Sequence, residues 1–220
     1  TCDRVGHGKS GGKRGHVKKY KYLFDDIERL HTEATRRYPK VPVFLYGHSM
    51  GGGLVIDYLL HHPNMSFKGV IATSPLLKPA FEPPKILTQL ARLIRPIYGS
   101  FSQDNGLDKD ALSSDKSVVE AYVNDPLVHT KITAESAIGG LDSGLQSLRT
   151  VGKLARPLLL LHGDQDAITS HKASAQFAVK AQGPITLKIW EGGYHELHNE
   201  PDKMDVLDFM AKWLDQHLRG

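Results

Sequence analysis

Short apolar runs alternate with stretches of helical periodicity along this chain of 220 residues. An unbroken apolar run of four to eight residues is typical of a strand that is buried on both faces of a parallel sheet. Apolar residues that recur every three or four positions instead predict helices with one buried face. The alternation therefore predicts an α/β fold with a mostly parallel sheet and helices on both faces. The apolar runs lie at 41–46, 156–163 and 185–190, and the helical stretches lie at 20–34, 50–62 and 206–214.

A long segment at about 77–152 lacks strand character and separates two of these units. It contains three candidate helices, at 84–97, after Asp115, and at about 133–148. The apolar stripe of the first helix predicts packing against the main body, a helical cap over a site, or both. Because no linker divides the chain, the sequence predicts one domain at 1–220 that carries the cap as an insertion.

Residues 47–51, Gly-His-Ser-Met-Gly, join the first apolar run to the helix predicted at 50–62. A Gly-x-Ser-x-Gly between a strand and a helix describes the nucleophile elbow, a tight turn that raises a serine hydroxyl above the sheet. Glycine suits both ends of this turn because a side chain there would crowd the backbone. The context favours Ser49 as a nucleophile over a glycine-rich turn without chemistry.

The two later strand ends carry the acid and imidazole groups that a nucleophilic serine needs. Asp164 and Asp166 follow the second apolar run, and His195 and His198 follow the third. Because the carboxyl ends of parallel strands meet at one edge of a sheet, we expect these groups to lie near Ser49. The two histidines lack a third ligand with zinc-like spacing, so we expect no metal and no cofactor.

Four further segments of the chain indicate which family of serine hydrolases it resembles. They are Asp-Arg-Val-Gly-His-Gly-Lys-Ser at 3–10, Ser-Pro-Leu at 74–76, Tyr-Val-Asn-Asp-Pro-Leu at 122–127 and Tyr-His-Glu-Leu-His at 194–198. Together with the elbow they make the chain similar to the monoglyceride lipases, a branch of the α/β-hydrolase superfamily. The elbow alone specifies only the superfamily, whereas the segments at 122–127 and 194–198 specify the branch. The resemblance covers essentially the whole chain and implies an α/β-hydrolase fold with a helical cap insertion.

The resemblance implies a catalytic triad of Ser49, Asp166 and His195. The acid of the family stands three residues after the glycine that ends its strand, which here is Gly163, and this spacing favours Asp166. Asp164 is the alternative acid, and its other interpretation is a residue that bonds nearby backbone amides in a turn. In such a triad the serine attacks an ester carbonyl, the histidine transfers the proton and the aspartate stabilises the imidazolium.

The resemblance also implies groups that would contact the substrate. The backbone N–H of Met50, directly after the nucleophile, would donate to the oxyanion. Tyr122 lies where the cap of the family offers a hydroxyl to the glycerol head group, and a buried helix tyrosine is the alternative interpretation. His198 would lie near the pocket as a substrate-binding residue or pack within its loop.

The second oxyanion donor of the family comes from a His-Gly turn after the third strand, and no such turn precedes residues 3–10. We therefore expect three N-terminal strands of the usual eight to be absent from the chain, with a gap beside the elbow strand. Our preferred interpretation is a missing N-terminal segment that belongs to a longer protein or is supplied by a partner chain. The alternative is a short homologue that pairs the vacant edge through a partner or a rearranged strand.

Charge and composition bear mainly on the partners of the chain. The net charge is +4, and basic residues cluster between positions 9 and 21, so weak attraction to an anionic lipid surface and peripheral membrane contact are expected. Aromatic residues are not interleaved with the basic ones, which disfavours nucleic acid as a partner. No apolar stretch is long enough to span a bilayer, and Cys2, the single cysteine, cannot form an intrachain disulfide. These features favour a cytoplasmic, membrane-associated enzyme.

The function implied by the resemblance is hydrolysis of a lipid ester, namely cleavage of monoacylglycerol into fatty acid and glycerol through an acyl-enzyme on Ser49. One alternative is a general carboxylesterase or a lysophospholipase, which would use the same triad on another acyl substrate. A second alternative is an inactive hydrolase fragment or a binding protein that keeps only the scaffold. Epoxide and haloalkane hydrolases are disfavoured because their elbow carries aspartate where Ser49 stands.

Overall fold

The sheet at the centre of the molecule contains four parallel strands in the order β1-β2-β5-β6. The computed structural model describes residues 1–218. Three of these strands match the predicted apolar runs, and Ser74, which the resemblance places at a strand end, directly follows the remaining one. The strands are β1 (Phe44–His48), β2 (Gly69–Thr73), β5 (Leu158–Gly163) and β6 (Ile185–Trp190).

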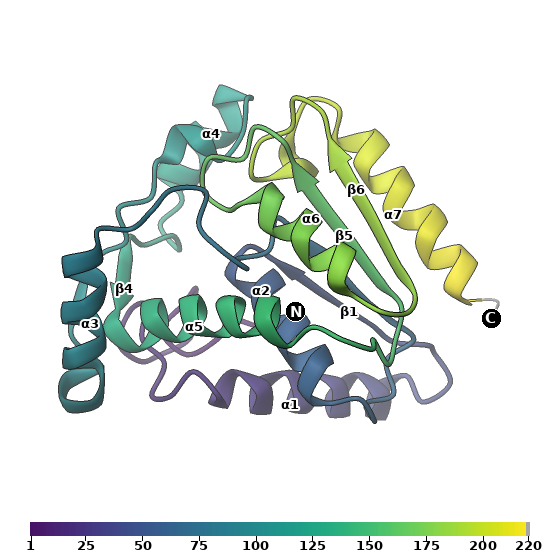
Figure 1. Cartoon of the computed structure of the whole chain (residues 1–220), viewed down its shortest axis with the longest axis horizontal. Coiled ribbons are helices and arrows are strands. Elements are labelled where there is room, and N and C mark those ends of the chain that lie inside the picture. Colours follow the sequence, from purple (N-terminus) through teal and green to yellow (C-terminus); the bar gives the residue numbers. More distant parts are fainter. Residues whose placement is uncertain (219–220) are drawn as a thin grey trace.

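Helices cover both faces of this sheet (Figure 1). Successive side chains of β5 point to opposite faces, as they do in any strand. Leu160 joins the larger apolar cluster, whereas Leu161 joins a smaller cluster on the other face. The larger cluster includes residues of α1 (Tyr22–Arg37), α2 (Met50–His61) and α6 (His171–Lys180), and the smaller one includes residues of α7 (Lys203–Leu218). The predicted α/β architecture is confirmed.

Between β2 and β5 the chain forms an insertion that contains all three expected helices. The expectation that this segment lacks strands is wrong, because β3 and β4 pair as a small antiparallel sheet. Each has three residues, and Ser-Gln-Asp and Lys-Ile-Thr are too short and too polar to show an apolar run. The elements are α3 (Lys85–Tyr98), β3 (Ser102–Asp104), the 3₁₀ turn η1 (Lys109–Ala111), α4 (Lys116–Asn124), β4 (Lys131–Thr133) and α5 (Ala134–Thr150).

The inner and outer helices of this insertion differ in burial. The inner helix α5 packs against α2, and a β-carbon at Gly144 would lie 2.3 Å from the carbonyl oxygen of Leu76. Only glycine permits so close an approach to the backbone. The outer helix α3 packs on α5, has no buried residue and lies at the margin of the molecule (Figure 1).

The first residues of the chain form turns that lie against the insertion. Ser136 Oγ donates to the carbonyl oxygen of Gly15 at 2.8 Å, and His129 Nε2 lies 2.9 Å from the carbonyl oxygen of Gly6. Within residues 1–218 no strand pairs with the outer side of β1. The elbow strand is therefore an edge of the described sheet, at the place where the sequence predicts a gap.

Candidate active site

The turn from β1 into α2 holds Ser49 in a strained conformation. Its φ of 55° and ψ of −120° are uncommon for a residue with a side chain, and such strain concentrates at functional sites. The surrounding backbone stabilises the turn, because the N–H of Ser49 donates to Thr73 at 3.0 Å and its carbonyl accepts from Gly53 and Leu76. A β-carbon at Gly47 would lie 2.3 Å from the carbonyl oxygen of Gly51. These are the features of a nucleophile elbow.

Ser49, His195 and Asp166 form a continuous hydrogen-bonded array at the carboxyl ends of the strands. Ser49 Oγ lies 2.9 Å from His195 Nε2, and His195 Nδ1 lies 2.8 Å from Asp166 Oδ2. A carboxylate oxygen only accepts, so Nδ1 carries the proton and Nε2 presents its lone pair to the serine hydroxyl. Both partners of the serine are buried, with 3% of His195 and 5% of Asp166 exposed. The arrangement suits proton abstraction from Ser49.

The carboxylate of Asp166 is held in its ionised form. Burial by itself would raise the pKa of this group, but hydrogen bonds from His162 and His195 outweigh it and hold the pKa well below its usual range. Oδ1 also accepts the backbone N–H groups of Ile168 and Thr169, at 2.8 and 2.9 Å. A buried negative charge therefore faces the imidazole of His195, where it would stabilise an imidazolium.

Asp164, the alternative acid, occupies a different position. Its Oδ1 accepts the backbone N–H of Gly192 at 2.8 Å and lies 3.1 Å from the side-chain nitrogen of Gln165. It ties the loop after β5 to the turn after β6, which agrees with the interpretation as a turn residue. Of the two aspartates, Asp166 is the one that bonds His195 in the described structure.

A mostly apolar cavity of about 810 Å³ opens beside Ser49. Met50 lies at its wall, and as the first residue of α2 it has a backbone N–H that the helix itself does not use. That N–H is the oxyanion donor expected from the sequence. The cavity is roofed largely by the insertion, and its apolar lining includes Leu76, Phe81, Leu107, Leu127, Ile132 and Ile168.

The two expected substrate-binding residues have different surroundings. Tyr122 from α4 lines the cavity, and burial followed by the charge of Glu196 raises the pKa of its hydroxyl. His198 is not part of the lining. Its ring packs against His48 with centroids 4.9 Å apart, and its Nδ1 is buried with no hydrogen-bond partner among the described residues. The structure thus places Tyr122 beside the cavity, whereas His198 packs against His48 at the end of β1.

The ring of His48 packs against both His198 and His195. Its Nδ1 is 3.0 Å from Thr73 Oγ1, and its ring centroid is 4.8 Å from that of His195. Burial, followed by the neighbouring His195 and His198, lowers the pKa of His48 to about 3. His48 is therefore neutral near pH 7 and does not add a positive charge beside His195.

Three buried residues support the array although the sequence analysis assigns them no role in it. Ser74 Oγ donates to the carbonyl oxygen of His195 at 2.6 Å, and Ser74 itself has a φ of 44°. Thr169 Oγ1 lies 2.8 Å from Asp166 Oδ2, and His162 Nε2 lies 3.0 Å from the same oxygen. A polar residue at the end of an apolar strand, four positions before the acid, is the signal that could have identified His162.

The described part of the chain shows neither a cluster of metal ligands nor a helix that could span a membrane. Within residues 1–218 no three His, Cys, Asp or Glu side chains gather in a way that could hold a metal ion. None of the helices described there is both long and apolar enough to cross a bilayer.

Comparison with known proteins identifies the family. The family described as serine aminopeptidase, S33, matches residues 1–202. The monoacylglycerol lipase of Mycolicibacterium smegmatis is 33% identical over 220 residues, which cover 99% of this chain and 78% of that protein. An uncharacterised abhydrolase domain-containing protein of Dictyostelium discoideum is 36% identical, and the match covers 99% of this chain but only 23% of that protein.

The same relationship appears in three dimensions. The crystal structure of the monoacylglycerol lipase of Paleococcus ferrophilus superposes with a TM-score of 0.90 at 31% identity, over 98% of this chain and 82% of that chain. The chain belongs to the serine aminopeptidase S33 family of α/β-hydrolases and is similar, over nearly its whole length, to the monoacylglycerol lipases.

Proposed function

We propose that the chain is a serine hydrolase that cleaves monoacylglycerol into fatty acid and glycerol. The observation that carries this proposal is the hydrogen-bonded array of Ser49, His195 and Asp166 beside a mostly apolar cavity of about 810 Å³. Such an array activates a serine toward esters, and the apolar cavity suits an acyl chain. The names of the related lipases support monoacylglycerol as the substrate class.

In the proposed reaction Ser49 Oγ attacks the ester carbonyl while His195 Nε2 accepts its proton. The oxyanion that forms accepts a hydrogen bond from the N–H of Met50. His195 then returns the proton to the leaving glycerol oxygen, which breaks the ester bond and leaves the acyl group on Ser49. Water attacks this acyl-enzyme, again with His195 as the base, and releases the fatty acid. Asp166 stabilises the imidazolium in both steps.

The insertion at about 77–152 acts in this proposal as a cap within one domain at 1–220. Burial of each methylene of the acyl chain in the cavity is worth about 0.8 kcal/mol, so medium and long chains are favoured over acetate. Tyr122 is half-buried at the cavity wall and would offer its hydroxyl to the glycerol head group. A triacylglycerol, with two further chains, would be a poor substrate.

Two assays test the proposal. Covalent labelling of Ser49 by a fluorophosphonate, absent in Ser49→Ala, separates a working hydrolase from an inactive scaffold. A panel of monoacylglycerols, lysophospholipids and p-nitrophenyl esters then separates the substrate classes. A preference for lysophospholipids or for acetate esters would replace the monoacylglycerol assignment with the corresponding alternative.

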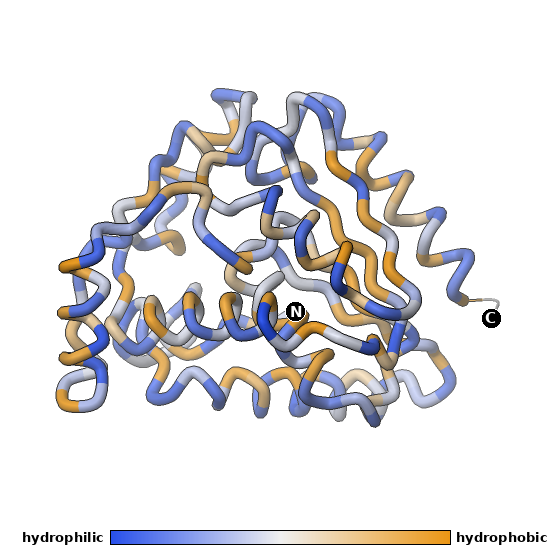
Figure 2. The backbone as a smooth tube through the Cα atoms, in the orientation of Figure 1, coloured by the Kyte–Doolittle hydropathy of each residue, from blue (hydrophilic) through white to orange (hydrophobic). Residues whose placement is uncertain are grey.

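The exposed face of α3 supports a further part of the proposal, peripheral contact with an anionic membrane on the cytoplasmic side. Ile86, Leu93 and Ile97 lie along α3 and are 80%, 70% and 89% exposed. Figure 2 shows that hydrophobic and hydrophilic positions alternate along α3 at the margin of the molecule. An exposed apolar stripe of this kind is typical of an interaction surface. Cys2 is exposed and unpaired, which suits a reducing compartment.

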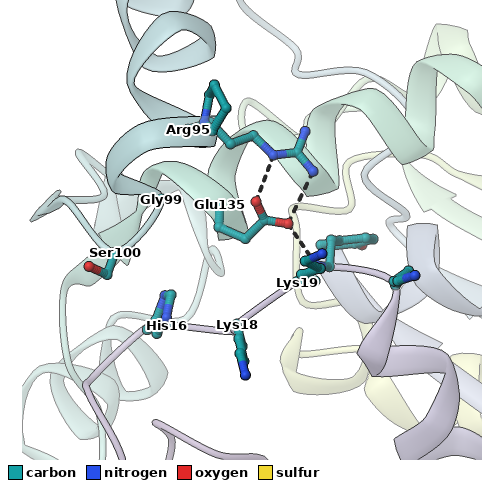
Figure 3. Close-up of a pocket in the computed structure, with 10 residues that line it drawn as sticks. His16, Lys18, Lys19, Arg95, Gly99, Ser100 and Glu135 are labelled. Carbon is teal, nitrogen blue, oxygen red and sulfur yellow. Dashed lines mark hydrogen bonds and ion pairs between the residues drawn. The ribbon is translucent and has the colours of Figure 1, made fainter.

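Basic residues lie beside this helix. Lys18 and Lys19 border a cavity of about 660 Å³ that also contacts Arg95 near the end of α3 (Figure 3). Arg95 is engaged by Glu135 at 2.7 Å, whereas no ion pair within residues 1–218 involves Lys18 or Lys19. Each basic residue near an anionic surface contributes about 1 kcal/mol to membrane binding. The apolar stripe and the adjacent lysines together fit a lipid surface.

A further inference from the structure

The imidazole of His162 is a second histidine that contacts the acid of the triad. Its Nε2 lies 3.0 Å from Asp166 Oδ2, the same oxygen that His195 Nδ1 approaches at 2.8 Å. His162 is fully buried at the end of β5 and does not line the cavity beside Ser49. Any effect of His162 on the chemistry therefore passes through Asp166.

The neighbours of His162 determine which of its nitrogens carries a proton. Nε2 faces two groups that only accept, Asp166 Oδ2 and, at 3.1 Å, the carbonyl oxygen of Thr169. The hydroxyl of Thr169 lies 3.2 Å from Nε2 but closer to two other acceptors, Asp166 Oδ2 and the carbonyl oxygen of Ser74, to which its proton can be donated. Nε2 must therefore be the donor. On the other side of the ring, Ser174 Oγ lies 2.8 Å from Nδ1 and supplies a hydroxyl that can donate to it. Ser174 thus holds the ring in the orientation that points an N–H at Asp166.

We propose that His162 is a positioning residue for the hydrolysis: it holds Asp166 in place and, by sharing the carboxylate with His195, sets how strongly Asp166 favours the protonated form of His195. The inference rests on the proposed roles of Asp166 and His195. A hydrogen bond to an ionised carboxylate disperses its charge, so two imidazole donors leave less negative charge for the imidazolium than one donor would. Loss of the His162 donor should make His195 bind its proton more tightly.

Other titratable groups surround the array, and among the described residues none of them bonds to Asp166 as His162 does. From β1, the neutral ring of His48 packs on His195; from η2 (Leu197–Asn199), His198 packs on His48; and Glu196 precedes that turn. From α6, the ring of His171 lies 6.4 Å from that of His162. None of these groups donates to Asp166 in the described structure. A change in the negative charge that Asp166 presents to His195 can therefore be assigned to the loss of His162.

Two amide variants form a matched pair for the test. In His162→Gln the side-chain amide reaches the place of Nε2 and can still donate to Asp166. In His162→Asn the shorter amide reaches only the place of Nδ1, beside Ser174. The acid limb of the kcat/KM profile for a p-nitrophenyl ester should stay in place in the Gln variant. In the Asn variant it should move upward by about half to one pH unit, and kcat should fall about tenfold with KM unchanged.

The same pH profile of kcat/KM in the two variants would overturn the proposal. A residue that only packs would not depend on which nitrogen position the amide occupies. NMR supplies readouts that need no activity: the titration midpoint of His195 should rise in His162→Asn and not in His162→Gln. In the unaltered protein the Nε2 proton of His162 should appear as a slowly exchanging downfield signal, and its absence would also overturn the proposal, even if the Asn variant does not fold. Failure of the proposed function would instead appear as no ester turnover and no fluorophosphonate labelling in the unaltered protein.

Discussion

The surroundings of Asp166 and the outer helix α3 are opposite environments, one buried and polar and the other exposed and partly apolar. Around Asp166, two imidazoles, a hydroxyl and two backbone N–H groups surround one buried carboxylate. Along α3 no residue is buried, and Ile97 is 89% exposed. A buried charge persists only where its partners are built into the fold, whereas exposed apolar area remains available for a partner outside the chain. The first region therefore suits the proposed hydrolysis, and the second suits the proposed membrane contact.

The proposed triad provides the largest expected effect in the buried region. Ser49→Ala, His195→Ala and Asp166→Asn should each reduce ester turnover by roughly 10³ to 10⁶, because the three groups act as a unit. Asp164→Asn is the matched control, and it should cost less than about tenfold because Asp164 bonds the backbone of Gly192 rather than His195. If Asp164→Asn is the more damaging change, Asp166 is not the acid.

Substitutions in the exposed region should weaken membrane binding and leave the rate of ester hydrolysis unchanged. Replacement of Ile86, Leu93 and Ile97 together by serine should weaken co-sedimentation with anionic vesicles by roughly 10- to 100-fold, because the methylenes that would enter the lipid are lost. Turnover of a water-soluble p-nitrophenyl ester should not change. Val179→Ser on α6, where the side chain is 87% exposed, is the control and should leave vesicle binding intact. Unchanged binding in the triple variant would remove α3 from the membrane contact.

The buried region should also make stability depend on pH. Because the pKa of His48 is lowered to about 3 in the folded state, the unfolded chain takes up a proton between about pH 6.5 and pH 3 that the folded chain does not. The contribution of neutral His48 is present in full above this window and is lost as the pH falls through it. The free energy of unfolding should fall by up to roughly 1.4 kcal/mol per pH unit more steeply than in His48→Gln. Denaturant titrations at pH 7, 6 and 5 measure both slopes, and parallel slopes would contradict the burial of His48.

Tyr122 provides the smallest effect and lines the cavity beside Ser49 from α4. Tyr122→Phe should lower kcat/KM for monoacylglycerol about three- to tenfold, which corresponds to one hydrogen bond to a glycerol hydroxyl. A p-nitrophenyl ester has no such hydroxyl and should be hydrolysed at the same rate by both proteins. Equal losses on the two substrates would make Tyr122 a packing residue only.

The local features of the fold could be read from the sequence because they arise from neighbouring residues. An apolar run becomes a strand of the parallel sheet wherever both faces are covered, and residues 47–51 form a tight turn in which Gly47 leaves no room for a side chain. The expectation that a side chain at Gly51 would also crowd the backbone is wrong, because a β-carbon there would meet open space. The helices of the insertion could be predicted for the same reason, because their apolar residues recur every three or four positions. The strands β3 and β4 could not be predicted, because each is stabilised by a partner 27 to 31 residues away and not by a pattern of its own.

The order of the chain therefore determined which residues stand at the strand ends: Ser49, the two aspartates and His195. Only the tertiary structure decided how they interact. It turned Asp166 toward His195 and Asp164 toward the backbone of Gly192, packed His198 against His48, and brought His162 onto the carboxylate of Asp166. These choices depend on which polar atoms become buried together, and a buried polar atom takes whichever partner the packing of distant strands leaves within reach.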